Sequence, residues 1–161
     1  MNYKNIFAGL FAAALLFSTG ASAQPAPYGA PITLDQAKKA MAAAEAEAKK
    51  NNWNVVIAIV DSGGNMVMLQ RLDNTQFGSV KVASEKAHGS AAFRRPTVAF
   101  QDLIAQGGVH LRLLNITGDA SVFEGGVPVV VDGKLIGAIG VSGVTSQQDA
   151  QIAQAGANAL K

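Results

Sequence analysis

One histidine and two adjacent arginines are the side chains of this sequence best suited to bind a ligand. His88 lies shortly before Arg94 and Arg95. Imidazole is a common metal ligand, and the guanidinium group of arginine pairs with carboxylates in a forked geometry that lysine lacks. These groups together predict a site for an anion that contains a metal. The alternative is an exposed histidine beside two surface arginines. The second histidine, His110, is the weaker candidate.

Glu85 and His88 form a Glu-x-x-His pair, which places a carboxylate and an imidazole on one face of a helix. Di-iron proteins use this spacing, but they need it on two helices together with further glutamates. The sequence holds one copy, so a mononuclear or intersubunit iron site and an ordinary surface pair both stay open. Cysteine is absent, which excludes disulfides, thiolate metal sites and thioether-linked cofactors.

Other ligand and reaction classes lack the residue patterns that they need. No Gly-x-Gly-x-x-Gly or Walker sequence occurs, and Ser142 lies outside any Gly-x-Ser-x-Gly elbow, so neither nucleotide binding nor a serine hydrolase is indicated. Gly125 and Gly126 predict a tight entry into a strand, with a backbone N–H nest for a carboxylate as the alternative. The formal net charge of +2 argues against nucleic-acid binding, which requires clustered cations.

The first residues have the composition of an export signal. Lys4 precedes an apolar run over residues 6–17, and small residues at 21–23 suit a signal peptidase. We therefore expect a signal peptide over 1–23, an extended lead-in over 24–31, and one domain over 32–161. The run is too short to span a bilayer, so we expect a periplasmic or extracellular protein without membrane insertion after cleavage.

The elements that must position these residues are predicted from caps, periodicity and turns. Thr33 and Gln36 form a capping box that starts a helix, whose apolar stripe is Leu34, Ala37, Met41, Ala44 and Ala48. Strands over 55–60 and 66–71 flank a Gly-containing turn. The Ala-rich segment 79–93 predicts a helix that carries Glu85 and His88 and that ends before Pro96.

The second half of the chain predicts two helices and another hairpin. Thr97 is placed to cap a short helix that reaches about Gln106, and Gly107-Gly108 would end it. The segment 109–117 fits strand or helix equally. Asp132-Gly133 between apolar runs over 127–131 and 134–141 predicts a hairpin, and a second capping box, Thr145 with Gln148, starts the last helix. The predicted fold class is α+β, with an antiparallel sheet covered by helices.

An ordered set of short segments resembles the GlcG/HbpS family, also called the DUF336 or haem-degrading domain, which occurs as well at the C-terminus of PduO-type adenosyltransferases. The segments cover nearly all of the chain after the leader. They are TLDQA (33–37), IAIVDSGGN (57–65), RLD (71–73), KA (86–87), FRRPT (93–97), GGVP (125–128), GAIGVSG (137–143), Asp149 and AG (155–156).

The resemblance implies a profilin-like α+β fold with a five-stranded antiparallel sheet, assembled into homo-oligomers. It also implies non-covalent haem binding, for buffering, sensing or degradation of haem. On that basis His88 is a candidate axial ligand, Arg94 and Arg95 are candidate partners of the propionates, and Thr97, Gly125 and Gly126 are further candidates. Where the family commonly has threonine, this chain has Gly89, which predicts that a porphyrin or a neighbouring helix approaches the backbone there.

A binding protein or enzyme for a short hydroxy acid or other carboxylate, without haem, is the alternative function. In that case the same arginines would bind the carboxylate directly. No catalytic motif decides whether the chain is an enzyme.

Overall fold

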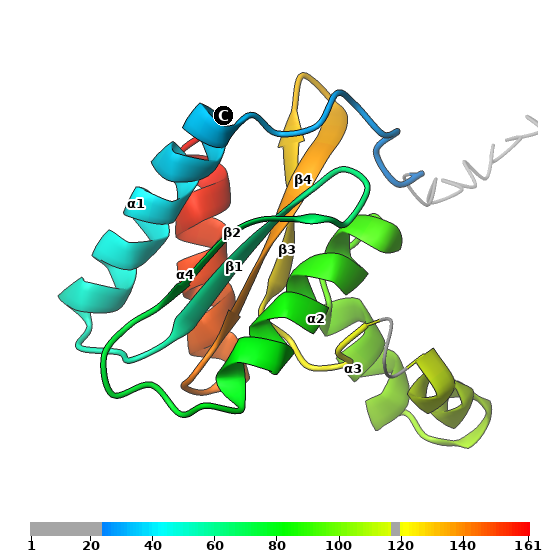
Figure 1. Ribbon diagram of the computed structural model, residues 1–161. Coiled ribbons are helices and arrows are strands. Elements are labelled where there is room, and N and C mark those ends of the chain that lie inside the picture. Colours follow the sequence, from blue (N-terminus) through cyan, green and yellow to red (C-terminus); the bar gives the residue numbers. More distant parts are fainter. Residues whose placement is uncertain (1–23, 117–119) are drawn as a thin grey trace, which may run out of the picture.

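The computed structural model describes residues 24–116 and 120–161, which form an antiparallel sheet between two layers of helices (Figure 1). The helices α1 (Leu34–Lys50) and α4 (Ser146–Asn158) cover one face of the sheet, and α2 (Ser79–Ala92) covers the other. The helix α3 (Val98–Ala105) and the 3-10 helix η1 (Gly108–Ile116) extend beyond α2. This arrangement confirms the α+β prediction.

The sheet has four strands among the described residues, in the order β2-β1-β4-β3. They are β1 (Val56–Asp61), β2 (Met66–Arg71), β3 (Gly126–Val131) and β4 (Lys134–Ser142), and all neighbours are antiparallel. The expectation of five strands is therefore wrong. The segment that fitted strand or helix equally became η1, and Tyr28 adds only an isolated parallel bridge to Leu135 of β4.

Both capping boxes are present. The Thr33 hydroxyl accepts a hydrogen bond from the Gln36 backbone N–H at the start of α1, and Thr145 and Gln148 repeat the arrangement in α4. The buried stripe of α1 contains the alanines and Met41 as predicted, but Leu34 is 52% exposed. Leu34 is the first residue of the helix, where half of its surface stays in contact with solvent, so its inclusion in the stripe was wrong.

The core has one part on each side of the sheet. The larger part joins α1, α4 and the facing strand residues, and the smaller part joins α2 to the other face through small side chains. Gly140 of β4 makes this close contact feasible, because a β-carbon there would collide with the backbone of Ala83 and Ala87. The glycine thus lets α2 pack directly on the backbone of this strand.

The predicted turns and boundaries agree with the structure. Asp132 and Gly133 adopt φ values of 49° and 72°, which is the left-handed pair that a tight hairpin needs. No helix among the described residues is long and apolar enough to cross a membrane. The predicted signal peptide, residues 1–23, lies outside the described residues.

Candidate functional site

His88 is held by the tight turn between β1 and β2. Its Nδ1 lies 3.0 Å from the carbonyl oxygen of Gly64. Because a carbonyl oxygen only accepts, the hydrogen bond requires a proton on Nδ1, and in the neutral imidazole the lone pair is then on Nε2. Metal-binding histidines are commonly oriented in this way, by donating the other ring N–H to a backbone carbonyl. The half-buried His88 is therefore prepared to act as a ligand through Nε2.

Glycine at position 64 permits this contact. Its φ of 82° is in the left-handed region, and a β-carbon there would lie 2.7 Å from His88 Nδ1. Any larger residue would both strain the turn and displace the imidazole. The sequence singled out His88 but gave no indication of this partner, because the two residues are distant along the chain.

Asp61 stiffens the turn that orients His88. Its Oδ1 accepts hydrogen bonds from the backbone N–H groups of Gly63 at 2.8 Å and Asn65 at 2.9 Å. The Asn65 side-chain amide also donates to the carboxylate. Desolvation raises the pKa of Asp61, but the hydrogen bonds from Asn65 and Gly63 outweigh it, so that the pKa is lowered overall.

A shallow hollow of about 500 Å³ lies at the C-terminal end of α2, beyond His88, which is not one of its lining residues. Tyr28 of the lead-in, Ser62 and Gly63 of the turn, and Ala92 line it. Ala92 is one helical turn beyond His88, and the Tyr28 hydroxyl donates to the Ala92 carbonyl at 2.9 Å. Figure 1 shows the β1–β2 turn and the lead-in beside this end of α2.

The two predicted arginines separate. The guanidinium carbon of Arg94 lies 5.2 Å from the ring centre of Tyr28, whereas that of Arg95 lies 6.0 Å from the ring centre of Phe100 in α3. Arg94 has a left-handed φ of 52° just after α2 ends. The structure therefore places Arg94 next to the hollow and Arg95 against α3.

Glu85 and His88 have separate partners. The Glu85 carboxylate lies 3.2 Å from Lys81 Nζ, and its side chain lines an apolar groove of about 330 Å³ together with Leu114 and Phe123. Among the described residues, no group of three or more His, Cys, Asp or Glu side chains could hold a metal ion. A site that binds a metal ion without a porphyrin could therefore use at most two of these side chains from the described residues.

Thr97 and Gly126 bind each other in the interior. The Gly126 N–H donates to the Thr97 hydroxyl at 2.9 Å, and the Thr97 N–H donates to the Gly126 carbonyl at 3.0 Å. Thr97 is fully buried, and it does not cap α3 through its side chain. The expected capping role of its hydroxyl is wrong, because the hydroxyl serves the start of β3 instead.

Sequence reasoning missed a buried ion pair beneath Gly125. Lys86 Nζ lies 2.8 Å from Asp149 Oδ2 and donates to the Val141 carbonyl at 2.9 Å. Burial lowers the pKa of Lys86 and raises that of Asp149, and the attraction between the two opposes both shifts. The pair joins α2 to α4 and β4. One signal was available: Lys86 falls on the same small-residue face of α2 as Ala83 and Ala87.

Residues 120 and 121, after η1, approach the backbone closely at Gly89 as predicted, but they are not helical, so the expected neighbouring helix is wrong. A β-carbon at Gly89 would lie 2.5 Å from the Ala120 β-carbon. The Ser121 N–H also donates to the Glu85 carbonyl. Protein atoms therefore fill the space beside Gly89, so a porphyrin does not lie there.

Comparison with known proteins gives consistent matches. The model of the family described as "Haem degrading protein HbpS-like" matches residues 32–158. Protein GlcG of Escherichia coli K12 is 42% identical over 112 residues, which are 69% of this chain and 81% of that protein. An uncharacterised 15.0 kDa protein of Citrobacter freundii is 40% identical over 127 residues, which are 78% and 89% of the two chains.

Two solved structures extend the likeness to haem-related proteins. The structure described as a PduOC:heme complex has a TM-score of 0.76 and 28% identity, and the match covers 81% of this chain and 96% of that one. The HbpS structure has a TM-score of 0.74 and 31% identity, over 83% and 92% of the respective chains.

Proposed function

The chain belongs to the HbpS-like family of haem-degrading proteins, and from this premise we propose that it binds haem non-covalently with His88 as the axial ligand. The observation that carries the proposal is the hydrogen bond between His88 Nδ1 and the Gly64 carbonyl, which leaves Nε2 free to bind iron. The absence of cysteine is consistent with non-covalent attachment. Bound haem would supply an iron centre that changes oxidation state.

The surroundings of His88 suit a flat anionic ligand. The hollow offers the Tyr28 ring and the Ala92 methyl group as apolar contacts, and Arg94 is placed beside it to pair with a propionate. Arg95 and the buried Thr97, Gly125 and Gly126 belong to other parts of the structure, so the proposal does not use them as contacts. Because the hollow is shallow, we infer that a second copy of the chain covers the exposed face of the porphyrin in a homo-oligomer.

The proposal includes the location and the biological role. With its predicted signal peptide the protein would work in the periplasm or outside the cell, where it would buffer or sense haem. Degradation of the haem is the further role that the family description suggests. A degrading role predicts that bound haem loses its Soret band and releases iron when peroxide or a reductant is added. A buffering or sensing role predicts that the haem stays intact.

Titration of the purified protein with hemin tests the proposal. We expect a saturable, shifted Soret band that is weakened in a His88→Ala variant. His110→Ala is the matched control, because His110 lies in η1 and should leave the spectrum unchanged. A hemin spectrum that the wild-type protein does not alter, or one that is identical in the His88→Ala variant, would contradict it.

A second candidate function is the binding of a short carboxylic or hydroxy acid by Arg94. This arginine contacts Tyr28 but has no carboxylate partner among the residues at 24–116 and 120–161. A true ligand raises the melting temperature by mass action. Thermal shift with short carboxylic acids, compared between wild type and Arg94→Gln, separates this function from haem binding.

A further inference from the structure

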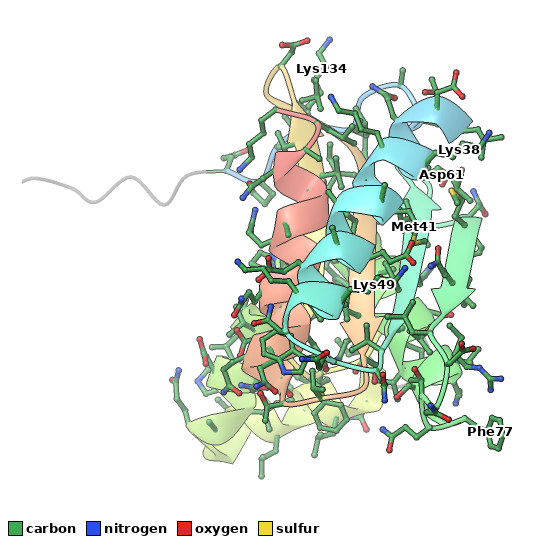
Figure 2. All side chains as sticks on the ribbon, turned by 90° about the vertical axis from the view of Figure 1, so that its left-hand side faces the viewer. Lys38, Met41, Lys49, Asp61, Phe77 and Lys134 are labelled. Carbon is green, nitrogen blue, oxygen red and sulfur yellow. The ribbon has the colours of Figure 1, made fainter. Side chains whose placement is uncertain are left out.

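A polar groove of about 430 Å³ lies between the α1–β1 loop and the β2–α2 loop. In Figure 1 these loops are at the lower left, whereas the lead-in and the β1–β2 turn, whose residues line the hollow near His88, are at the upper right. Figure 2 likewise places Asp61 of the β1–β2 turn and Phe77 of the β2–α2 loop at opposite ends of the molecule. The groove is therefore a separate feature from the proposed haem site.

Backbone hydrogen bonds fix both walls of the groove. The Trp53 N–H donates to the Ala48 carbonyl at 3.0 Å, which ties the first loop to the end of α1. In the second loop, the Leu72 N–H donates to the Val55 carbonyl at 3.0 Å, and the buried Thr75 hydroxyl donates to Val55 and to Leu72. The groove consequently exists before any ligand binds, which reduces the entropy cost of binding.

An aromatic ring with a free donor forms part of the lining. Trp53 is half-buried and packs against the hydrophobic core, so its ring has little freedom. Its indole N–H has no hydrogen-bond partner among the residues that the structure describes. A fixed ring of this kind offers an apolar face and one directed hydrogen bond to a ligand.

Three side-chain amides from the two loops share the groove. Asn52 and Asn54 flank Trp53, and Asn74 belongs to the second loop. All three residues are exposed, and in the described part of the chain none of their amides has a protein hydrogen-bond partner, so they bind solvent that a ligand could replace. Each amide can donate and accept, so the three together can bind groups that also do both.

The charges of the groove balance. Glu45 and Lys49 form an ion pair with a 2.6 Å contact. The hydrogen bond from Lys49, followed by one from Gln70, lowers the pKa of Glu45. The remaining ions are Arg71, which is stacked on Phe77 at 4.9 Å, and the carboxylate of Asp73. The groove thus carries no excess of either sign to select an anion or a cation.

We propose that this groove binds a neutral polyhydroxylated ligand of the saccharide class. Hydroxyl groups both donate and accept, which matches the three amides, and the C–H face of a sugar ring packs against an indole. An amino acid would use the two charges of Arg71 and Asp73 but would leave the amides and the ring without a role. The proposal does not depend on haem binding.

Trp53 is the single tryptophan of the chain, so its fluorescence reports on this groove alone. We would titrate the haem-free protein with maltose, cellobiose and N-acetylglucosamine. A saturable change in emission is expected with at least one sugar. Asn54→Ala and Asn74→Gly should each raise its Kd roughly tenfold, as expected for the loss of one or two hydrogen bonds. Glycine is chosen at position 74 because Asn74 has a φ of 61°.

Two controls keep the outcomes distinct. Asn115→Ala changes an exposed asparagine of η1 and should not alter the Kd, and His88→Ala should bind sugar normally even if it fails to bind hemin. The proposal is overturned if no sugar changes the emission of the folded wild-type protein. It is equally overturned if the groove variants retain wild-type affinity, or if glutamate binds where the sugars do not.

Discussion

The Gly64→Ala variant keeps His88 but should change the orientation of its imidazole, so it tests whether hemin binding depends on that orientation. The added methyl group would lie 2.7 Å from His88 Nδ1, so the imidazole must move and give up its hydrogen bond to the Gly64 carbonyl. The left-handed φ of 82° costs an alanine about 1–2 kcal/mol. The lost hydrogen bond adds about 1 kcal/mol. The expected fall in the free energy of unfolding is therefore about 2–3 kcal/mol.

The same substitution should weaken hemin binding. Removal of the group that orients a metal-binding histidine typically lowers metal affinity about 10–100-fold. Gly133→Ala is the matched control, because Gly133 also has a left-handed φ, of 72°, but a β-carbon there meets nothing within 4 Å. It should lose about 1–2 kcal/mol of stability and keep its hemin affinity.

Urea unfolding and hemin titration of the three proteins provide the measurement. If Gly64→Ala bound hemin as tightly as the wild type, while it was destabilised like Gly133→Ala, the turn would have no part in presenting His88. The reasoning from the Gly64 carbonyl to a free Nε2 would then be refuted.

Three further changes test other parts of the structure. Asp149→Ala should lower the free energy of unfolding by about 3–5 kcal/mol, because it leaves Lys86 charged and buried. Adding Lys86→Met should recover much of this loss, as measured by urea unfolding. A double variant that is no more stable than the single variant would contradict the ion-pair account. Asp61 has a lowered pKa in the folded protein, so its stabilising effect is present above the ordinary carboxyl pKa and is lost as the pH falls through the folded value. Asp61→Asn should flatten this acid-side decrease, and an unchanged pH profile would count against the role of the turn. Thr97→Val leaves the buried Gly126 N–H without its acceptor and should cost about 1–3 kcal/mol, measured as a lower urea midpoint.

Features encoded by neighbouring residues were predictable from the sequence. The capping boxes at Thr33 and Thr145 and the Asp132-Gly133 turn depend on residues a few positions apart, and the structure has all of them. The segment that became η1 had no dominant periodicity, so its fold could not be decided locally. It forms a 3-10 helix without buried residues that packs against α3.

The site was predictable only in part, because its geometry depends on contacts between distant segments. His88 and Arg94 could be chosen by residue type, but the Gly64 carbonyl and the Tyr28 ring come to them from other elements. The adjacent arginines suggested a single cluster, but Arg94 lies over Tyr28 and Arg95 lies over Phe100 of α3. The ion pair between Lys86 and Asp149 joins residues far apart in sequence, so spacing could not predict it.

Chemical rescue of a His88→Gly variant tests the central claim most directly. With hemin added, this variant should lack the Soret band of the wild-type complex, and free imidazole should restore it by entering the space of the missing side chain and binding the iron. The control is His110→Gly, which should show the wild-type band without any added imidazole. A variant lacking His88 whose hemin spectrum equals that of the wild type without imidazole would show that His88 is not the ligand.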